Sequence, residues 1–97
     1  MVTIEDLRKP WLIVSNNARN SQLPSALAVR ITTTRKPNLD AIVELAPSDP
    51  LVGRVLCDEI GTIWHDELEE TRGTLTPATM MRVDAGLRAA LALRGPT

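Results

Sequence analysis

The sequence predicts a mainly β fold with a C-terminal α-helix, arranged as a small antiparallel barrel or curled sheet. The chain has 97 residues, which fits one domain over residues 1–97. Four or five short apolar runs are separated by turn residues, and a single helical pattern follows them. Strands and helices do not alternate as they do in parallel sheets, which favours an antiparallel arrangement.

The N-terminal part predicts a helical turn, a strand and a loop, in that order. Residues 3–7 can begin a helix, because Thr3 can cap it and acidic residues follow in its first turn. Pro10 ends this turn. Residues 11–14 form a continuous apolar run, which is typical of a strand buried on both faces. Residues 15–21 are rich in Ser and Asn and predict a turn.

Three later apolar runs predict further strands, at residues 26–33, 41–45 and 53–64. Gly61 indicates a bend or bulge, so the last run can be one strand or two short ones. Residues 66–72 are polar and predict a short turn or a 3₁₀ segment.

The C-terminal helix has the clearest pattern in the chain. Thr76 is a favourable N-cap and Pro77 takes the first helical position. Apolar residues recur at helical spacing, at Met80, Val83, Leu87, Ala90 and Leu91. We expect this stripe to seal the open end of the sheet, and Gly95 and Pro96 to end the helix.

The composition excludes several classes of protein. Two Trp, with no Tyr and no Phe, exclude nucleic-acid modules that stack bases on aromatic platforms. The single cysteine, Cys57, lies in an apolar run and predicts a buried thiol without an internal disulfide. The first ten residues carry charges where a secretory signal would be apolar, and no run has transmembrane length. We therefore expect a cytoplasmic protein that does not enter a membrane.

Charge is strongly segregated along the chain, although the net charge is only −1. Residues 1–40 hold six Lys or Arg and three Asp or Glu, whereas residues 41–70 hold one Arg and eight acidic residues. The basic N-terminal part can bind phosphate locally, even though an acidic chain is a poor nonspecific binder of nucleic acid. The acidic part is typical of a solvated surface.

The chain predicts no metal and no cofactor. His65 is the only histidine, whereas a structural zinc site needs four nitrogen or sulfur ligands. The sequence has no glycine-rich phosphate loop. We expect His65 to lie in a solvated loop, with a proton-shuttle role as the alternative because its pKa class suits neutral pH.

The remaining chemical groups follow or flank the predicted strands. Lys9 precedes the first strand, whereas Thr32, Thr33 and Arg35 end the second. Asp58 interrupts an apolar run, where it can face water, pair with a cation or act as a base. Metal-free RNA cleavage needs a base, an acid and fixed positive charge at the phosphate, and these residue types can supply them.

The ordered motifs of this chain resemble those of the MazF/PemK family of toxin endoribonucleases. Residues 9–16 read Lys-Pro-Trp-Leu-Ile-Val-Ser-Asn, close to the family's Arg-Pro-x-(Val/Leu)-(Ile/Val)-Val-Ser-Asn. Residues 29–33 match a strand that ends in Thr, and residues 55–63 match a strand with an internal acid. Residues 73–76 and 83–87 match the family's final turn and helix, so the resemblance covers about residues 9–93.

The resemblance implies an SH3-like barrel of the MazF/PemK/CcdB type and a homodimer. It also implies a type II toxin, a sequence-selective, metal-independent endoribonuclease that cleaves single-stranded RNA such as mRNA, tRNA or rRNA. A cognate MazE-like antitoxin would inhibit it. By position, Lys9 matches the family's catalytic arginine, Thr32 its catalytic threonine and Asp58 an acid used as base. The expected substrate-binding residues are Ser15, Asn16, Thr33, Arg35 and Arg54.

The chain departs from the family pattern in two main ways. Lys9 replaces an arginine, which keeps the charge but loses the bidentate fork for phosphate. The family also opens with a strand and a flexible loop, and residues 1–8 are too few to supply both. Either the chain start is mis-assigned, the chain is truncated, or the protein has lost a strand. A missing strand would leave residues 11–14 as an unpaired edge unless residues 1–8 or a dimer partner cover it.

Two alternatives to an RNA-cleaving toxin remain open from the sequence. With an incomplete groove, the protein would be a catalytically impaired module that dimerises and binds an antitoxin. The other alternative is a gyrase-binding toxin on the same fold.

Overall fold

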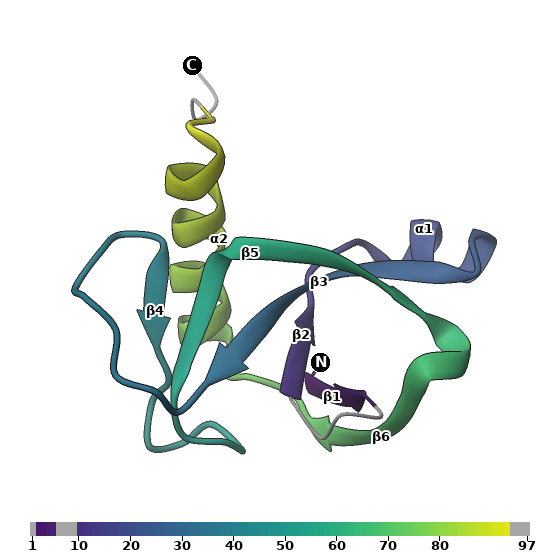
Figure 1. Cartoon of the computed structure of the whole chain (residues 1–97), viewed down its shortest axis with the longest axis horizontal. Coiled ribbons are helices and arrows are strands. Elements are labelled where there is room, and N and C mark those ends of the chain that lie inside the picture. The colour runs from purple at the N-terminus through teal and green to yellow at the C-terminus, as the bar shows by residue number, and fades with distance from the viewer. Residues whose placement is uncertain (1, 6–9, 94–97) are drawn as a thin grey trace.

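The computed structural model describes the backbone of residues 2–5 and 10–93, and the side chains of residues 10–67 and 73–93. Six strands, two α-helices and a 3₁₀ helix lie in these residues (Figure 1). In chain order they are β1 (Val2–Glu5), β2 (Pro10–Ile13), α1 (Asn17–Gln22), β3 (Ser25–Thr32), β4 (Ile42–Glu44), β5 (Arg54–Trp64), η1 (His65–Glu67), β6 (Leu68–Gly73) and α2 (Pro77–Leu91).

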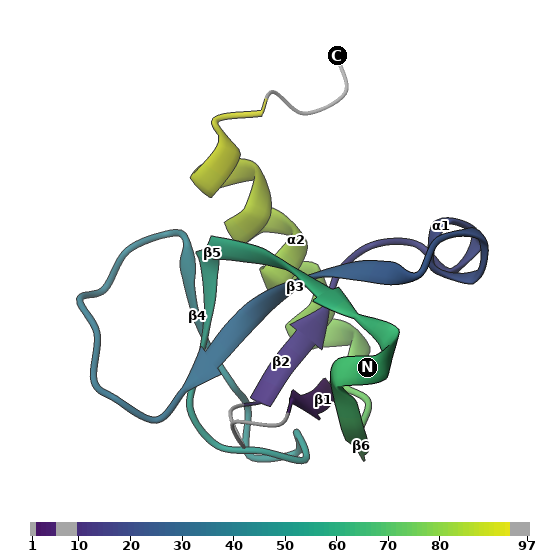
Figure 2. The same cartoon turned by 45° about the vertical axis from the view of Figure 1, so that its right-hand side comes forward.

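The six strands form one antiparallel sheet in the order β4-β5-β3-β2-β1-β6. β3 and β5 are the longest strands, and they pair along their whole common length. The sheet curls, so that β5 runs through η1 into β6 and returns beneath β1 and β2 (Figures 1 and 2). The predicted mainly β fold with a C-terminal helix is thus confirmed.

The prediction for the N-terminal segment is wrong. Residues 3–5 were expected to begin a helical turn, but they belong to the strand β1. β1 pairs with β2, where Thr3 is opposite Trp11, and with β6, where Ile4 is opposite Glu70. Residues 2–5 thus cover the edge of β2, which is one of the outcomes that the sequence left open.

Two other local predictions differ from the structure, the first through a helix cap and the second through strand pairing. Residues 15–21 were expected to form a turn, but Asn16 caps the short helix α1. Residues 66–72 were expected to form a turn or 3₁₀ segment, and only η1 matches this. The rest is strand β6, which exists because β1 supplies its hydrogen-bond partner.

β5 is a single strand with an irregularity at residues 57–59. Val29 of β3 is opposite Ile60, whereas the next residue, Arg30, is opposite Leu56. Three residues of β5 therefore have no partner on β3, as in an extended β-bulge. The Cys57 amide bonds instead to the Ala41 carbonyl, at 2.9 Å. Irregularity was predicted at Gly61, but that residue lies in register.

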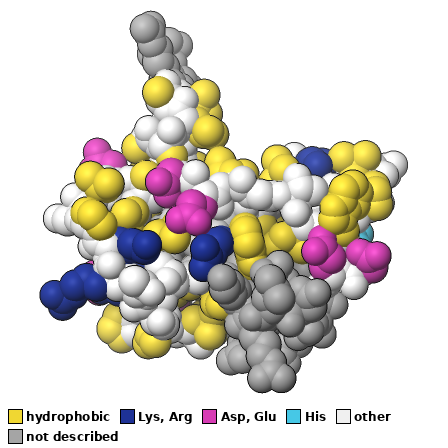
Figure 3. Space-filling view, in the orientation of Figure 1, with side chains coloured by type: hydrophobic (Ala, Val, Ile, Leu, Met, Phe, Trp, Pro, Cys, Tyr) yellow, Lys and Arg dark blue, Asp and Glu magenta, His cyan; other side chains and the backbone are white. Residues whose placement is uncertain are grey.

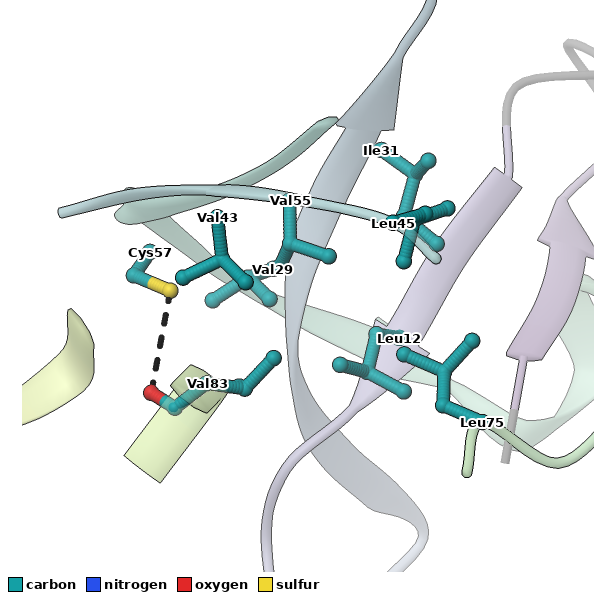
Figure 4. Close-up of a cluster of buried hydrophobic side chains, with 9 residues drawn as sticks. All are labelled: Leu12, Val29, Ile31, Val43, Leu45, Val55, Cys57, Leu75 and Val83. Atoms are coloured by element: carbon teal, nitrogen blue, oxygen red, sulfur yellow. Dashed lines mark hydrogen bonds between the residues drawn. The ribbon is translucent and has the colours of Figure 1, made fainter. Parts of the chain in front are cut away.

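The core lies between the sheet and α2, and it is aliphatic. Figure 4 shows its members converging from four strands, the segment before α2 and α2 itself: Leu12, Val29, Ile31, Val43, Leu45, Val55, Cys57, Leu75 and Val83. Gly86 lets α2 approach closely, since a Cβ there would lie 2.8 Å from the Cys57 Sγ. Close packing of α2 on the sheet therefore requires a residue without a side chain at this position.

α2 begins as predicted and ends earlier than predicted. Thr76 accepts a hydrogen bond from the Thr79 amide, and Pro77 starts the helix. The helix ends at Leu91, where Ala92 adopts a left-handed conformation with φ 54°. The expected terminators at residues 95 and 96 lie outside the described residues. Leu91, assigned to the packing stripe, is 52% exposed.

None of the helices in the described ranges is both long enough and apolar enough to cross a membrane.

Candidate active site

A row of three polar side-chain positions crosses the sheet at the end of β3. Thr32 is the last residue of β3 and is opposite Arg54 of β5, which in turn is opposite Glu44 of β4. A hydroxyl, a guanidinium and a carboxylate thus lie on neighbouring strands. Directly opposed residues have Cβ atoms about 5 Å apart, so the three can contact a common ligand.

Gly53 allows the β4–β5 connection to come close to Thr32. Its φ is +133°, and a Cβ at this position would lie 2.4 Å from the Thr32 carbonyl oxygen. The Gly53 carbonyl accepts a hydrogen bond from the Leu45 amide at 2.9 Å, which closes the connection. A side chain here would push the end of β3 away, because both the backbone conformation and the space require glycine.

Two cavities share Arg54 and Glu44 in their linings. The larger, of about 700 Å³, is lined by Thr33, Glu44, Leu45, Ala46, Pro47, Val52, Gly53, Arg54 and Arg82. The other, of about 450 Å³, is lined by Arg35, Lys36, Pro37, Asn38, Ile42, Glu44 and Arg54. Figure 3 shows that the Lys and Arg side chains of the viewed face lie mainly on the half of the molecule that carries β4. The arrangement suits an anionic ligand that spans both cavities.

The ion pair between Arg54 and Glu44 is weak. Its shortest distance is 3.7 Å, and the Glu44 side chain is 74% exposed. Exposed ion pairs contribute between zero and about 1 kcal/mol. A bound phosphate can therefore replace Glu44 as the ion-pair partner of Arg54 at a small cost in free energy.

Thr32 already takes part in local structure. Its hydroxyl oxygen accepts a hydrogen bond from the Thr34 amide at 3.1 Å. This bond fixes the side-chain oxygen at the strand end and leaves its O–H free to donate to an acceptor such as a phosphate oxygen.

A second polar group beside the larger cavity escaped prediction from the sequence. Buried Asp49 accepts hydrogen bonds from the Thr79 hydroxyl at 2.7 Å, the Ala46 amide at 2.7 Å and the Thr76 amide at 2.8 Å. Burial alone would raise the pKa of Asp49, but these hydrogen bonds outweigh it and lower that pKa below its usual 3.8. Asp49 therefore stays ionised and ties the β4–β5 connection to the first turn of α2.

Arg82 is held by the same network. It donates to the Glu44 carbonyl at 2.7 Å and to the Thr79 hydroxyl at 3.1 Å. Its cation reaches the cavity that Arg54 also lines. An arginine on the exposed side of a helix has no sequence signal of this role, because Glu44 lies 38 positions earlier and Thr79 is held by the distant Asp49.

Asp58 lies apart from this row. It is exposed, and it lies in the irregular part of β5, four residues from Arg54, which is about 13 Å along an extended strand. Its neighbour Glu59 pairs with Arg30 at 3.5 Å. Asp58 does not line either cavity beside Arg54.

Ser15 and Asn16 lie at the opposite end of β3. The Ser15 hydroxyl accepts from the Leu27 amide at 2.9 Å and donates to Asn20 at 2.5 Å. The Asn16 side chain caps α1 through the Arg19 amide at 2.8 Å. The structure therefore does not bring these two expected substrate-binding residues together with Thr32, because their polar atoms build the β2–α1 turn. His65 is also near this far end, where its neighbour Trp64 is opposite Ser25.

Lys9, the expected match to the family's catalytic arginine, lies outside the described residues. Among the side chains that the structure describes, no three His, Cys, Asp or Glu come together as metal ligands would.

The fold defines a class: a small antiparallel β domain with a C-terminal helix, which places a hydroxyl and cations at the end of β3. Residues 4–91 match the family of PemK-like, MazF-like toxins of type II toxin–antitoxin systems. The chain therefore belongs to this family, as its motifs predicted.

Two relatives that are 50% identical to this chain over 88 aligned residues are named endoribonucleases. The match to Endoribonuclease MazF4 of Mycobacterium tuberculosis, and equally to Endoribonuclease MazF1 of Mycobacterium bovis, is 50% identical and covers 91% of this chain and 83% of each relative. The predicted enzyme class, endoribonuclease, is that of these relatives.

Solved structures agree with the fold. A mycobacterial endoribonuclease in complex with its cognate antitoxin superposes with a TM-score of 0.92 at 48% identity, covering 98% of this chain and 94% of that one. A MazE–MazF complex from Deinococcus radiodurans, at 21% identity and a TM-score of 0.80 over 96% of this chain and 93% of that one, shares the fold.

Proposed function

We propose that this toxin cleaves single-stranded RNA without a metal ion, with the scissile phosphate bound at the end of β3. The observation that supports this most is that Thr32 at the end of β3 is opposite Arg54, which lines both cavities. In this arrangement the scissile phosphate binds at Thr32 and Arg54, and one nucleotide lies in each cavity. A single RNA strand can pass over the end of β3 in this way.

The proposed reaction is a transesterification within the RNA. The 2′-oxygen attacks the adjacent phosphorus, the bond from phosphorus to the 5′-oxygen breaks, and the products are a 2′,3′-cyclic phosphate and a 5′-hydroxyl. A base removes the 2′-hydroxyl proton, and an acid returns a proton to the leaving 5′-oxygen. Thr32 donates a hydrogen bond to a phosphate oxygen, and Arg54 stabilises the added negative charge of the transition state.

Lys9 is the proposed second cation. It immediately precedes Pro10, the first residue of β2, and Trp11 of β2 is opposite Arg30 of β3. The start of β2 is therefore at the same end of β3 as Thr32. An ammonium group from Lys9 would neutralise phosphate as a point charge rather than by a bidentate fork.

Two carboxylates are candidates for the base. Asp58 is the one that the family resemblance implies, and Glu44 is the one in the Thr32–Arg54 row. Glu44 lines both cavities, so we rank it first. Replacing each carboxylate with its amide separates the two candidates. Only the replacement of the true base should abolish activity and remove the corresponding ionisation from the pH–rate profile.

The partners follow from family membership. We propose that the toxin forms a homodimer in the cytoplasm and is inhibited by a MazE-like antitoxin, as the mycobacterial relative was solved with its own antitoxin. We also propose that cleavage is selective for sequence, since two cavities of different lining would contact the nucleotides on either side of the scissile phosphate.

The experiment is a comparison of RNA cleavage rates in EDTA. Wild type should cleave a long single-stranded RNA, and Thr32→Ala should be at least about a hundredfold slower, as is found when a transition-state hydrogen bond is lost. Thr62→Ala is the matched control, since Thr62 is exposed on β5 opposite Leu27, far from the site. Equal rates for wild type and Thr32→Ala would refute the proposal.

A further inference from the structure

We infer that Arg82 forms a second phosphate subsite in the larger cavity, which holds the nucleotide next to the scissile phosphate at Arg54. This inference rests on the proposed cleavage of RNA and adds a residue of α2 to the site. The sequence motifs do not include Arg82, and the network that positions it is visible only in the folded chain.

The guanidinium of Arg82 is fixed before any ligand arrives. Its two hydrogen bonds, to the Glu44 carbonyl and to Thr79, come from different elements. Thr79 is fully buried and is itself held by Asp49 and Thr76. A preorganised cation binds an anion with less loss of side-chain entropy than a free one does.

The charge of Arg82 is not neutralised by a direct ion pair. Within the described residues, the side chains that form salt bridges are those of Arg30 with Glu59 and of Arg54 with Glu44. Asp49 reaches Arg82 only through Thr79. A guanidinium has five N–H groups, and those left over can donate to phosphate oxygens.

The cavity fits one nucleotide beside the cleavage site. Its volume of about 700 Å³ lies within the range of small-molecule sites, which runs from about 300 to 1,000 Å³. Thr33, the residue after Thr32, forms one wall, so an occupant there is adjacent to the scissile phosphate. Pro47 and Val52 supply apolar surface for a ribose or base, in a chain that offers few aromatic side chains.

A purely structural role is the alternative for Arg82, because it also links α2 to β4. The salt dependence of RNA binding separates the two roles. Each phosphate contact to a single strand contributes about 0.7 to the slope of log Kd against log salt concentration, whereas loss of a helix contact changes stability without changing that slope.

The test measures binding of a fluorescein-labelled pool of random 2′-O-methyl RNA 12-mers, which lack the attacking hydroxyl and are not cleaved. Arg82→Gln should bind about tenfold more weakly than wild type and lower the salt slope by about 0.7. Arg88→Gln is the control, because Arg88 is an exposed arginine on the same helix that does not line the cavity. It should keep the wild-type slope.

A second variant covers the case in which Arg82→Gln does not fold. Val52 is 77% exposed on the cavity wall, so Val52→Glu adds a repelling carboxylate without burying it, and binding should again weaken several-fold. Thr62→Glu adds the same charge elsewhere and should have less effect. An unchanged slope in Arg82→Gln, or equal effects of Val52→Glu and Thr62→Glu, would overturn the subsite. If wild type itself fails to bind the pool, the proposed function fails instead.

Discussion

Asp49 links two parts of the site that are far apart in the sequence. One oxygen accepts from the Thr76 amide at the start of α2, and the other accepts from Thr79 and from the Ala46 amide. The same carboxylate thus closes the β4–β5 connection, caps the helix and orients the residue that holds Arg82. It is buried and hydrogen-bonded, which explains an acid inside an otherwise aliphatic region.

Replacing Asp49 should change both stability and its pH dependence. Because the folded state lowers the pKa of Asp49 below 3.8, the carboxylate stabilises the fold above about pH 4, and this contribution is lost as the pH falls through the folded pKa. Asp49→Asn should therefore lower the free energy of unfolding by about 2 kcal/mol at pH 7, and the difference from wild type should shrink on acidification. Urea unfolding between pH 2 and 7 measures this.

The control for Asp49 is Asp84→Asn. Asp84 is exposed on α2, so its replacement should leave the unfolding curve nearly unchanged. A constant difference between wild type and Asp49→Asn at every pH would contradict the role assigned to the ionised carboxylate.

Cys57 should be chemically inert while the protein is folded. Burial, and secondarily the negative charge of Asp58, raise the pKa of this thiol from 9.0 to about 11. At pH 8 this reduces the thiolate fraction about a hundredfold, and burial blocks the reagent as well. Iodoacetamide labelling followed by mass spectrometry should be at least a hundredfold slower in buffer than in urea. Equal rates would show that the sheet opens at Cys57.

At the level of elements, the sequence predicted those structures that have their own local signal. α2 was predicted from its cap, its proline and its apolar spacing, and β3 from its apolar run. β6 could not be predicted, because it is polar and becomes a strand only beside β1. β1 was missed because Thr3 and the acids after it also fit a helix start, although Val2, Thr3 and Ile4 are β-branched. The helix α1 was missed for a related reason: its Ser and Asn residues favour turns as well as caps.

The close contact of α2 with the sheet gives an element-scale prediction. Gly86→Val should lower the free energy of unfolding by about 2–3 kcal/mol. The Cβ of a side chain at residue 86 would lie 2.8 Å from the Cys57 Sγ and 3.0 Å from the Val43 Cγ2. Ala85→Val adds the same β-branched group at an exposed neighbour and should cost less than about 1 kcal/mol. Thermal and urea unfolding compare them, and equal losses would show that helix propensity rather than packing excludes a side chain at residue 86.

For the whole molecule, the site combines residues from four segments. Thr32, Arg35 and Arg54 could be named as candidates, because they follow or begin apolar runs. The structure places Arg35 and Arg54 on one cavity and Thr32 opposite Arg54. Glu44 and Arg82 could not be named, since their roles depend on strand register and on a buried network. The location of Ser15 and Asn16 could not be predicted. The sequence shows that they follow a strand, but not at which end of the sheet that strand finishes.

The alternative of a non-catalytic interaction module rested on an incomplete groove at the N-terminal side. β1 covers the edge of β2, which removes the unpaired edge from that alternative. No feature of the described residues favours the gyrase-binding alternative over RNA cleavage, whereas the relatives at half identity are named endoribonucleases.

The central claim is that the chain cleaves RNA by metal-independent transesterification, and the chemistry of the fragment ends tests it most directly. RNA incubated with purified wild-type protein in EDTA should give fragments with 5′-hydroxyl and 2′,3′-cyclic phosphate ends. Labelling of the 5′ ends by polynucleotide kinase without prior phosphatase treatment, together with mass spectrometry of the 3′ ends, identifies both. Fragments with 5′-phosphate ends, or cleavage that appears only when Mg²⁺ is added, would contradict the account.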